Sequence, residues 1–353
     1  MKVLLTHERF LPDWGGGGET IVYETARGLR SQGVDVRVLT TGDPAATEYA
    51  GVPTERLPMH RYRMNLASAH IARRARETDL VQTFNYHACW PSLRAGHAVR
   101  RPVICSFLGL FGDAWMDLKG RVWGPLFRAW ERRMLMLPFH RLCFLSEFSR
   151  RQALALGAPE SAAVTVCPGV ALERFHPAGR KDRLVLFAGK FSVRKGVFDV
   201  IEVARALPGY EFLMVGWGPE EDALRREAPP NVTIRRGESG TPPSAEYGRA
   251  RVFLFPSRAE TLGLVIPEAM ASGCAIASCV PLDFHGVRFR EGATGEMIEG
   301  VRRLMEDDAW FDECSQANLR AAEFYSWGRY TRELLALYEQ TLGGAPRGVA
   351  RTA

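Results

Sequence analysis

Two glutamates, Glu260 and Glu268, are separated by seven residues in the stretch SRAETLGLVIPEAMASG, residues 257–273. A carboxylate accepts two hydrogen bonds side by side, so it pairs well with the neighbouring hydroxyls of a sugar or a ribose. The preceding apolar run predicts a buried strand, and Pro267 and Gly273 are typical of a helix start and end. We therefore expect Glu260 in a loop and Glu268 in a first helical turn, where free backbone N–H groups would favour an anion.

Three basic side chains follow another apolar run in GKFSVRKG, residues 189–196. Lys190, Arg194 and Lys195 would neutralise a diphosphate, because neighbouring loops at the carboxyl edge of a parallel sheet converge on one ligand. A solvated basic loop is the alternative. Gly216, in VGWGPEE, adds a glycine turn after the next strand, and the lack of a GxGxxG pattern argues against a nicotinamide dinucleotide.

A run of glycines joins the first predicted strand to the first predicted helix in DWGGGGET, residues 13–20. Because Gly16, Gly17 and Gly18 carry no side chains, a ligand can approach their backbone closely at a helix N-terminus. A flexible loop that binds nothing is the alternative.

Composition limits the class of protein. A chain of 353 residues with 46% hydrophobic content exceeds one ordinary core and predicts two domains. Neither a signal pattern nor an apolar run of about 18 residues is found, so we expect a cytoplasmic protein. Seven scattered cysteines without CxxC spacing indicate reduced, mostly buried thiols: Cys89, Cys105, Cys143, Cys167, Cys274, Cys279 and Cys314.

Basic charge is concentrated in the first half of the chain. Residues 1–178 hold 23 Lys and Arg against 16 Asp and Glu, whereas residues 179–353 hold 23 against 24. This asymmetry favours an anionic partner for the first half, either a charged acceptor or the inner face of a membrane, with an ordinary solvated face as the alternative. Nucleic acid is not expected.

A basic amphipathic helix is predicted over residues 115–137, started or kinked at Gly124-Pro125. Packing of this helix on the first sheet is the preferred reading, and membrane docking is the alternative. Its predicted apolar face consists of Trp123, Phe127, Trp130, Met134 and Leu137.

Strands and helices alternate along the chain in two series. A polar linker over 175–183 divides them, so we predict two doubly wound, Rossmann-like α/β domains facing each other across a cleft. The domains are expected over 1–176 and 182–325, with a helix over 327–341 packing back on the first and a disordered tail over 343–353. The predicted strands are 2–7, 34–40, 79–84, 102–107, 141–146, 164–169, 184–189, 210–216, 232–237 and 252–256.

These motifs, in this order, resemble a retaining glycosyltransferase of family 4 with the GT-B fold. Glu260 to Glu268 is similar to the family's E-x7-E signature, continued by EAMASG. GKFSVRKG resembles its G-R-x4-K-G phosphate loop, VGWGPEEDAL its V-G-x-G-P turn, and GGGGE its N-terminal glycine loop. The segments VCPGVALERFHP and YSWGRYTRELLALYEQ also resemble family segments, so the similarity covers nearly the whole chain.

The resemblance implies a nucleoside-diphosphate-sugar donor, a hydroxyl acceptor and no cofactor or metal. Lys195 and Lys190 would neutralise the diphosphate, Glu268 would hold the ribose, and Glu260 would act beside the anomeric carbon. Gly16, Gly17 and Gly18 would approach the diphosphate from the first domain. The remaining donor contacts are expected from Thr261, Leu262, Gly263, Leu264, Val265, Gly189, Arg194 and Gly216. His87, Leu108 and Gly109 are expected in the acceptor cleft.

Three departures from the family pattern are visible. Leu108 stands where a T-x-H-G pattern places histidine, and Lys190 replaces arginine, which keeps the charge but loses the bidentate fork. The acidic loop expected after CAIAS is missing. A non-catalytic nucleotide-sugar-binding partner and a nucleotide-sugar epimerase are the alternative functions.

Overall fold

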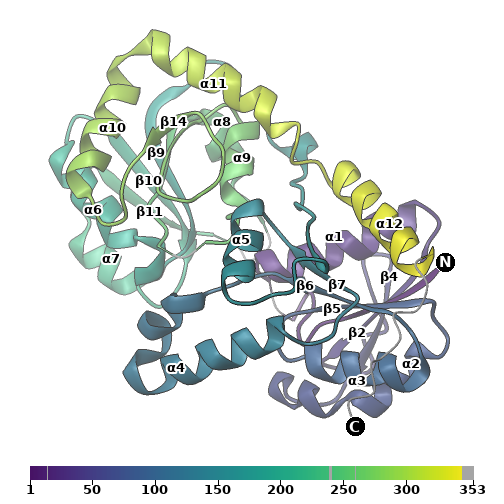
Figure 1. Cartoon of the computed structure of the whole chain (residues 1–353). Helices are drawn as coiled ribbons and strands as arrows, with labels where there is room; N and C mark the ends of the chain where they lie inside the picture. Colours follow the sequence, from purple (N-terminus) through teal and green to yellow (C-terminus); the bar gives the residue numbers. More distant parts are fainter. Residues whose placement is uncertain (14, 238–240, 259, 344–353) are drawn as a thin grey trace. The chain divides into compact units, whose positions relative to one another are not determined.

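The computed structural model describes residues 1–13, 15–237, 241–258 and 260–343, in two compact units (Figure 1). The first unit comprises Met1–Cys167 and the C-terminal residues from Gly328, and the second is Pro168–Trp327. The predicted tail lies outside the described residues from position 344 on.

The units divide before the predicted end of the first domain at residue 176. Val170 forms a β-bridge with Ser326, and the ring of Phe175 lies 5.9 Å from that of Tyr247. The segment after Cys167 therefore packs with the second unit.

The first unit contains an eight-stranded sheet with the order β3-β4-β2-β1-β5-β6-β7-β8. Every neighbouring pair is parallel except β3 with β4. Because parallel strands aligned by right-handed crossovers present their carboxyl ends at one edge, the loops after β1, β5 and β6 lie together there. The strands are β1 (Lys2–Thr6), β2 (Asp35–Thr41), β3 (Glu48–Tyr49), β4 (Val52–Leu57), β5 (Leu80–Phe84), β6 (Val103–Phe107), β7 (Arg141–Phe144) and β8 (Ala163–Thr165).

Helices cover both faces of this sheet. Side chains from four of them share one buried core on one face: α2 (Ser68–Ala75), α3 (Cys89–Val99), α4 (Trp115–Leu135) and α5 (Glu147–Ala155). The crossovers from β4 through β8 all run on that face, so the opposite face needs other cover. It is provided by α1 (Gly17–Ser31) and α12 (Trp327–Gly343), which are joined by a 2.8 Å hydrogen bond between the hydroxyls of Thr25 and Tyr330. Tyr338 of α12 also donates to the Gln82 side chain on β5.

The second unit contains a six-stranded parallel sheet with the order β11-β10-β9-β12-β13-β14. Helices α6, α7 and α10 group together, and α8, α9 and α11 form a second group (Figure 1). The elements are β9 (Asp182–Lys190), α6 (Val197–Ala206), β10 (Glu211–Trp217), α7 (Glu221–Glu227), β11 (Val232–Arg236), α8 (Ser244–Arg249), β12 (Ala250–Phe255), α9 (Val265–Ala271), β13 (Ala275–Ser278), β14 (Gly286–Arg288), α10 (Thr294–Glu306) and α11 (Asp308–Ala322).

Short 3-10 helices complete both units: η1 (Arg61–Leu66), η2 (Gly112–Ala114), η3 (Leu172–Arg174) and η4 (Val193–Lys195). The prediction of two Rossmann-like α/β domains is confirmed. All seven cysteines lie in described residues and are free, and six of them are buried. No helix among the described residues is long and apolar enough to span a bilayer.

Helix α4 differs from the prediction in two respects. Its break lies at Gly120, with φ of 72°, rather than at Gly124-Pro125, because a left-handed backbone suits glycine. Trp123, predicted on the buried face, is 61% exposed, whereas Met134 of the last turns is buried. Trp115 is buried at the start of the helix and the C-terminal half packs on the core, whereas Val122, Trp123 and Leu126 between them face solvent.

Candidate functional site

The loops after β9 and β12 meet through an ion pair between Lys195 and Glu260. The hydroxyl of Ser257 donates a second hydrogen bond of 2.9 Å to the same Glu260 oxygen, and the Lys195 ammonium lies 5.2 Å from the Phe255 ring centroid. Both charged side chains are largely buried, with 16% and 12% exposed. The two groups that the sequence assigns to reaction chemistry are therefore held against one another.

Backbone shape brings these two loops together. Gly196, which ends η4, has φ of 68°, and a Cβ there would lie 2.3 Å from the carbonyl oxygen of Pro256. Gly263 has φ of 73°, and a Cβ there would lie 3.6 Å from Cγ of Glu260. Both positions lie in the left-handed region where glycine is favoured. The glycines thus allow the phosphate-loop backbone and the glutamate loop to approach.

Five of the residues predicted as donor contacts, Thr261 to Val265, are consecutive in the chain. Thr261 to Leu264 form the loop, Leu262 is buried, and Val265 begins α9. Helix α9 has seven residues, Val265–Ala271, and its N-terminal end follows this loop directly.

Glu268 lies in the first turn of α9, as predicted, and is half-buried. The Tyr247 hydroxyl donates a hydrogen bond of 3.1 Å to its Oε2. Burial raises the pKa of the Glu268 carboxyl to about 7, although the Tyr247 hydrogen bond and the charge of Arg174 oppose this shift. Glu268 is therefore partly protonated near neutral pH, and anything that donates hydrogen bonds to it would favour its charged form.

Gly216, near the end of β10, and Gly218, directly after that strand, allow the backbone there to touch the end of β9 and the residues after it. A Cβ at Gly216 would lie 1.9 Å from the carbonyl oxygen of Gly189, and one at Gly218 would lie 2.1 Å from that of Phe191. The N–H of Phe191 donates to the carbonyl oxygen of Trp217 at 2.8 Å. These contacts bring the phosphate loop beside the V-G-x-G-P turn.

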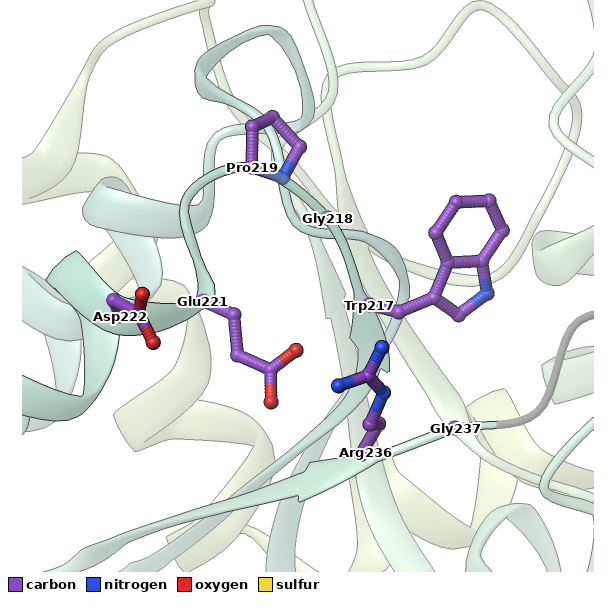
Figure 2. A pocket seen from close by; sticks show the side chains of 7 residues that line it. All are labelled: Trp217, Gly218, Pro219, Glu221, Asp222, Arg236 and Gly237. Atoms are coloured by element: carbon purple, nitrogen blue, oxygen red, sulfur yellow. The ribbon is translucent and has the colours of Figure 1, made fainter.

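A pocket of about 890 Å³ opens at the carboxyl ends of β10 and β11. Figure 2 shows the Trp217 indole on one side and the Arg236 guanidinium and Glu221 carboxylate on the other. The exposed Lys190 ammonium lies 5.5 Å from the Trp217 ring centroid. The pocket therefore borders the phosphate loop at Lys190, whereas the Lys195 and Glu260 pair does not line it. Arg194, also predicted here, accepts a hydrogen bond from the N–H of Arg258 at its carbonyl oxygen, at 2.9 Å.

In the first unit, the glycine loop meets the residue that departs from the family pattern. Gly16 is the N-cap of α1 and Gly17 is its first residue. A Cβ at Gly18 would lie 3.3 Å from Cδ1 of Leu108. The Leu108 side chain therefore stands against the glycine loop at the place where the family pattern has histidine.

A hydrogen-bond network shapes the loop that carries Leu108 and Gly109. The Asn85 side chain accepts from the N–H of Leu108 at 2.7 Å and donates to the carbonyl oxygen of Gly109 at 2.8 Å. Fully buried Glu131 of α4 accepts from the N–H groups of Phe111 and Gly112 at 3.0 and 2.7 Å. The Tyr86 hydroxyl donates to the same carboxylate at 2.6 Å.

His87 lies in an aromatic cluster after β5. Its ring stacks on Trp130 at 5.8 Å and contacts Tyr62 edge-on at 4.9 Å. Its Nδ1 lies 3.0 Å from the Asn65 amide nitrogen. Burial lowers the His87 pKa, and nearby Glu8 opposes this shift.

His7 and Glu8 follow β1 directly and were not among the residues predicted for the site. Both are more than nine-tenths buried, and His7 Nε2 lies 4.0 Å from Glu8 Oε2. That glutamate oxygen has no hydrogen-bond partner among the described residues. The rule that ligands bind beyond strand carboxyl ends would have found this pair.

Two family models match the chain. One described as Glycosyltransferase Family 4 matches residues 15–174, and one described as Glycosyl transferases group 1 matches residues 182–307. D-inositol 3-phosphate glycosyltransferase of Mycobacterium tuberculosis is 28% identical over 241 residues, which cover 58% of this chain and 49% of the relative. The chain thus spans about half the length of the curated relatives it matches.

Solved structures show the same fold at low sequence identity. Sucrose-phosphate synthase from Thermosynechococcus elongatus is 18% identical, with a TM-score of 0.78 over 96% of this chain and 98% of that one. Anabaena HepE in complex with UDP is 16% identical, with a TM-score of 0.80 over 96% of this chain and 100% of that one. HepE is also solved with UDP-glucose.

Proposed function

The chain belongs to the glycosyltransferases of family 4 with the GT-B fold, and on that premise we propose that it transfers a sugar from a nucleoside-diphosphate-sugar donor to a hydroxyl acceptor. The observation that carries the proposal is the buried pair of Lys195 and Glu260, set between glycine turns at a sheet edge. UDP and UDP-glucose in the HepE structures support a nucleotide sugar as the donor class.

Each donor group has a matching residue in the second unit. The diphosphate is assigned to Lys195 and Lys190, because an ammonium forms a charge-assisted hydrogen bond with a phosphate oxygen. When the diphosphate binds, the Lys195 ammonium would lie between the Glu260 carboxylate and a phosphate group. Glu268 is assigned to the ribose diol, whose two hydroxyls donate to one carboxylate.

The reaction is proposed to retain the anomeric configuration. The acceptor oxygen attacks the anomeric carbon, and the bond from that carbon to the diphosphate oxygen breaks. The acceptor proton passes to the departing phosphate on the same face, so the products are a glycoside and a nucleoside diphosphate. Positive charge at the anomeric carbon is stabilised by Glu260, and negative charge on the leaving group by Lys195 and Lys190. We propose no metal or other cofactor for this step.

The acceptor is assigned to the first unit, at the carboxyl ends of β1 and β5. Buried Glu8 offers an acceptor hydroxyl an oxygen that has no hydrogen-bond partner in the described part of the chain, and His87 lies nearby in its aromatic cluster. D-inositol 3-phosphate is the first acceptor to test, because the curated relatives are named for it.

A thermal-shift panel tests the donor assignment. UDP, GDP, ADP and dTDP are added separately, with magnesium or with EDTA, to the wild type and to Glu268→Ala. We expect one diphosphate to raise the melting temperature of the wild type equally in EDTA, and the shift to fall in the variant. No shift with any diphosphate would reject the proposed donor class.

A turnover measurement distinguishes an active glycosyltransferase from a non-catalytic nucleotide-sugar-binding protein. The sugar form of the selected nucleotide is incubated with and without D-inositol 3-phosphate, and nucleoside diphosphate release is measured. An active enzyme releases diphosphate in the wild type and loses that release in Glu260→Gln. Binding without release of diphosphate, with or without the acceptor, would favour a non-catalytic nucleotide-sugar-binding protein.

A further inference from the structure

Helix α4 exposes large apolar side chains on its first turns. Val122, Trp123 and Leu126 are 75%, 61% and 59% exposed, and Leu118, before the break at Gly120, is 36% exposed. Val122 and Leu126 are four residues apart, so they lie on one face of the helix. We call Leu118, Val122, Trp123 and Leu126 the α4 apolar patch.

Basic side chains share the exposed surface of α4 with this patch. All five basic residues of α4 are exposed: Lys119, Arg121, Arg128, Arg132 and Arg133. Arg121, Arg128 and Arg132 follow one another at spacings of seven and four, which places them along one side of the helix. The acidic content opposing them is small: Asp117 of the first turn is exposed, Glu131 is buried against backbone N–H groups, and Asp113 pairs with Arg128 at 3.0 Å.

We propose that the first turns of α4 dock in the interface of an anionic phospholipid bilayer. The α4 apolar patch would enter the boundary between headgroups and acyl chains, and the exposed arginines of α4 would contact lipid phosphates. Tryptophan is favoured at this depth because its ring is apolar and its N–H remains able to donate. The assignment does not depend on the sugar-transfer proposal.

Charge distinguishes a bilayer from a second copy of the chain. Two copies meeting through the same surface would oppose one cluster of arginines with another. An anionic lipid surface instead offers many phosphates to the same arginines. The charge pattern therefore favours lipid over self-association.

Vesicle co-sedimentation of the full chain tests the proposal. We expect binding to vesicles of equal parts phosphatidylcholine and phosphatidylglycerol, weakening with salt, and little binding to pure phosphatidylcholine. Arg121→Gln combined with Arg132→Gln should weaken binding roughly 25-fold, since each basic residue near the surface contributes roughly fivefold. Trp123→Ser combined with Leu126→Ser should abolish binding.

Phe324→Ser is the matched control, because Phe324 is a 52% exposed aromatic residue of the second unit. It should bind anionic vesicles as the wild type does, and all variants should melt at the wild-type temperature. Brominated phosphatidylcholine in the vesicles should quench the tryptophan fluorescence of the wild type. The Trp123→Phe variant should still bind the vesicles but should lose that quenching.

Three results would overturn the proposal. They are a wild type that stays in solution with anionic vesicles, a Phe324→Ser variant that loses as much binding as the α4 double variant, and quenching that persists in Trp123→Phe. If the wild type self-associates but does not bind vesicles, and Leu126→Ser abolishes that self-association, the α4 apolar patch would instead be a contact with a second copy of the chain.

Discussion

The ammonium of Lys195 and the carboxylate of Glu260 form an ion pair that joins the loop after β9 to the loop after β12. Residues 65 positions apart in the chain thus share one largely buried site. An incoming diphosphate must compete with Glu260 for Lys195, so diphosphate affinity and this ion pair are linked.

Lys195→Met is expected to weaken nucleoside diphosphate binding roughly 10- to 100-fold, because a charge-assisted hydrogen bond contributes about 1.5 to 3 kcal/mol. Lys190→Met is the comparison, and its effect should be smaller because its side chain is exposed beside Trp217. Calorimetric titration with the diphosphate that gives the largest thermal shift measures both. Equal losses in the two variants would contradict the central role given to Lys195.

Glu260→Gln should separate binding from turnover. Removing the carboxylate frees Lys195 for the phosphate, so diphosphate affinity should stay the same or increase. Sugar transfer should fall by about a hundredfold or more, since stabilisation of charge at the reacting centre is lost. A variant with normal turnover would show that Glu260 serves only to position Lys195.

Glu268 should make stability depend on pH. Its folded pKa of about 7 lies above the ordinary value of 4.5, so the folded protein holds this proton more tightly than the unfolded chain. Stability from this group is complete below about pH 4.5 and is lost as the pH rises to about 7, by at most about 3 kcal/mol. Urea unfolding at about pH 5 and pH 8 should show this decrease in the wild type, relative to Glu268→Gln. Parallel pH profiles for the two proteins would refute the assignment.

Nucleotide binding should favour the charged form of Glu268, whereas folding favours its protonated form. Ribose hydroxyls donate to the charged carboxylate, so nucleotide affinity should rise between about pH 6 and pH 8, by up to roughly tenfold. The diphosphate itself also titrates in this pH range. The decisive quantity is therefore the difference between the wild type and Glu268→Gln in how nucleotide affinity changes with pH, measured by calorimetry. The same rise in both proteins would place its cause in the nucleotide.

Gly196→Ala should destabilise the second unit and weaken diphosphate binding. Alanine is strained at a φ of 68°, and its Cβ would approach the Pro256 carbonyl oxygen to 2.3 Å, so we expect a loss of about 2 kcal/mol or more. Gly209→Ala is the control, because a Cβ at Gly209 meets nothing within 4 Å. Urea unfolding of both variants, followed by titration with diphosphate, gives the comparison. A Gly196→Ala protein as stable as Gly209→Ala would mean that the loops after β9 and β12 need not approach each other closely.

Glu131→Ala should destabilise the first unit by about 3 kcal/mol, because it leaves the N–H groups of Phe111 and Gly112 without their buried acceptor. Asp117→Asn, an exposed change on the same helix, should alter stability by less than about 0.5 kcal/mol. Chemical denaturation measures both. Similar stabilities of the two variants would show that water replaces the carboxylate.

Local patterns were sufficient to predict the elements around the site. The apolar runs before Lys190 and Glu260 predicted strands β9 and β12, and Pro267 with Gly273 predicted α9 between the correct limits to within two residues. The same patterns placed Glu260 in a loop and Glu268 in a first turn. The prediction of Trp123 on a buried face failed because helical periodicity shows which residues share a side but not whether the sheet reaches them.

By itself, the sequence determined the two-domain α/β class, ten of the fourteen strands among the described residues, and the residues that carry charge near strand ends, whereas β3, β4, β13 and β14 were not predicted. These features depend on local periodicity and on turn residues, which act over a few positions. Only the tertiary structure decided that Lys195 pairs with Glu260, that Glu131 holds the loop after β6, and that a buried Glu8 oxygen has no hydrogen-bond partner among the described residues. Such contacts join distant parts of the chain, and their geometry follows from how strands are ordered in a sheet and how closely glycines let loops approach.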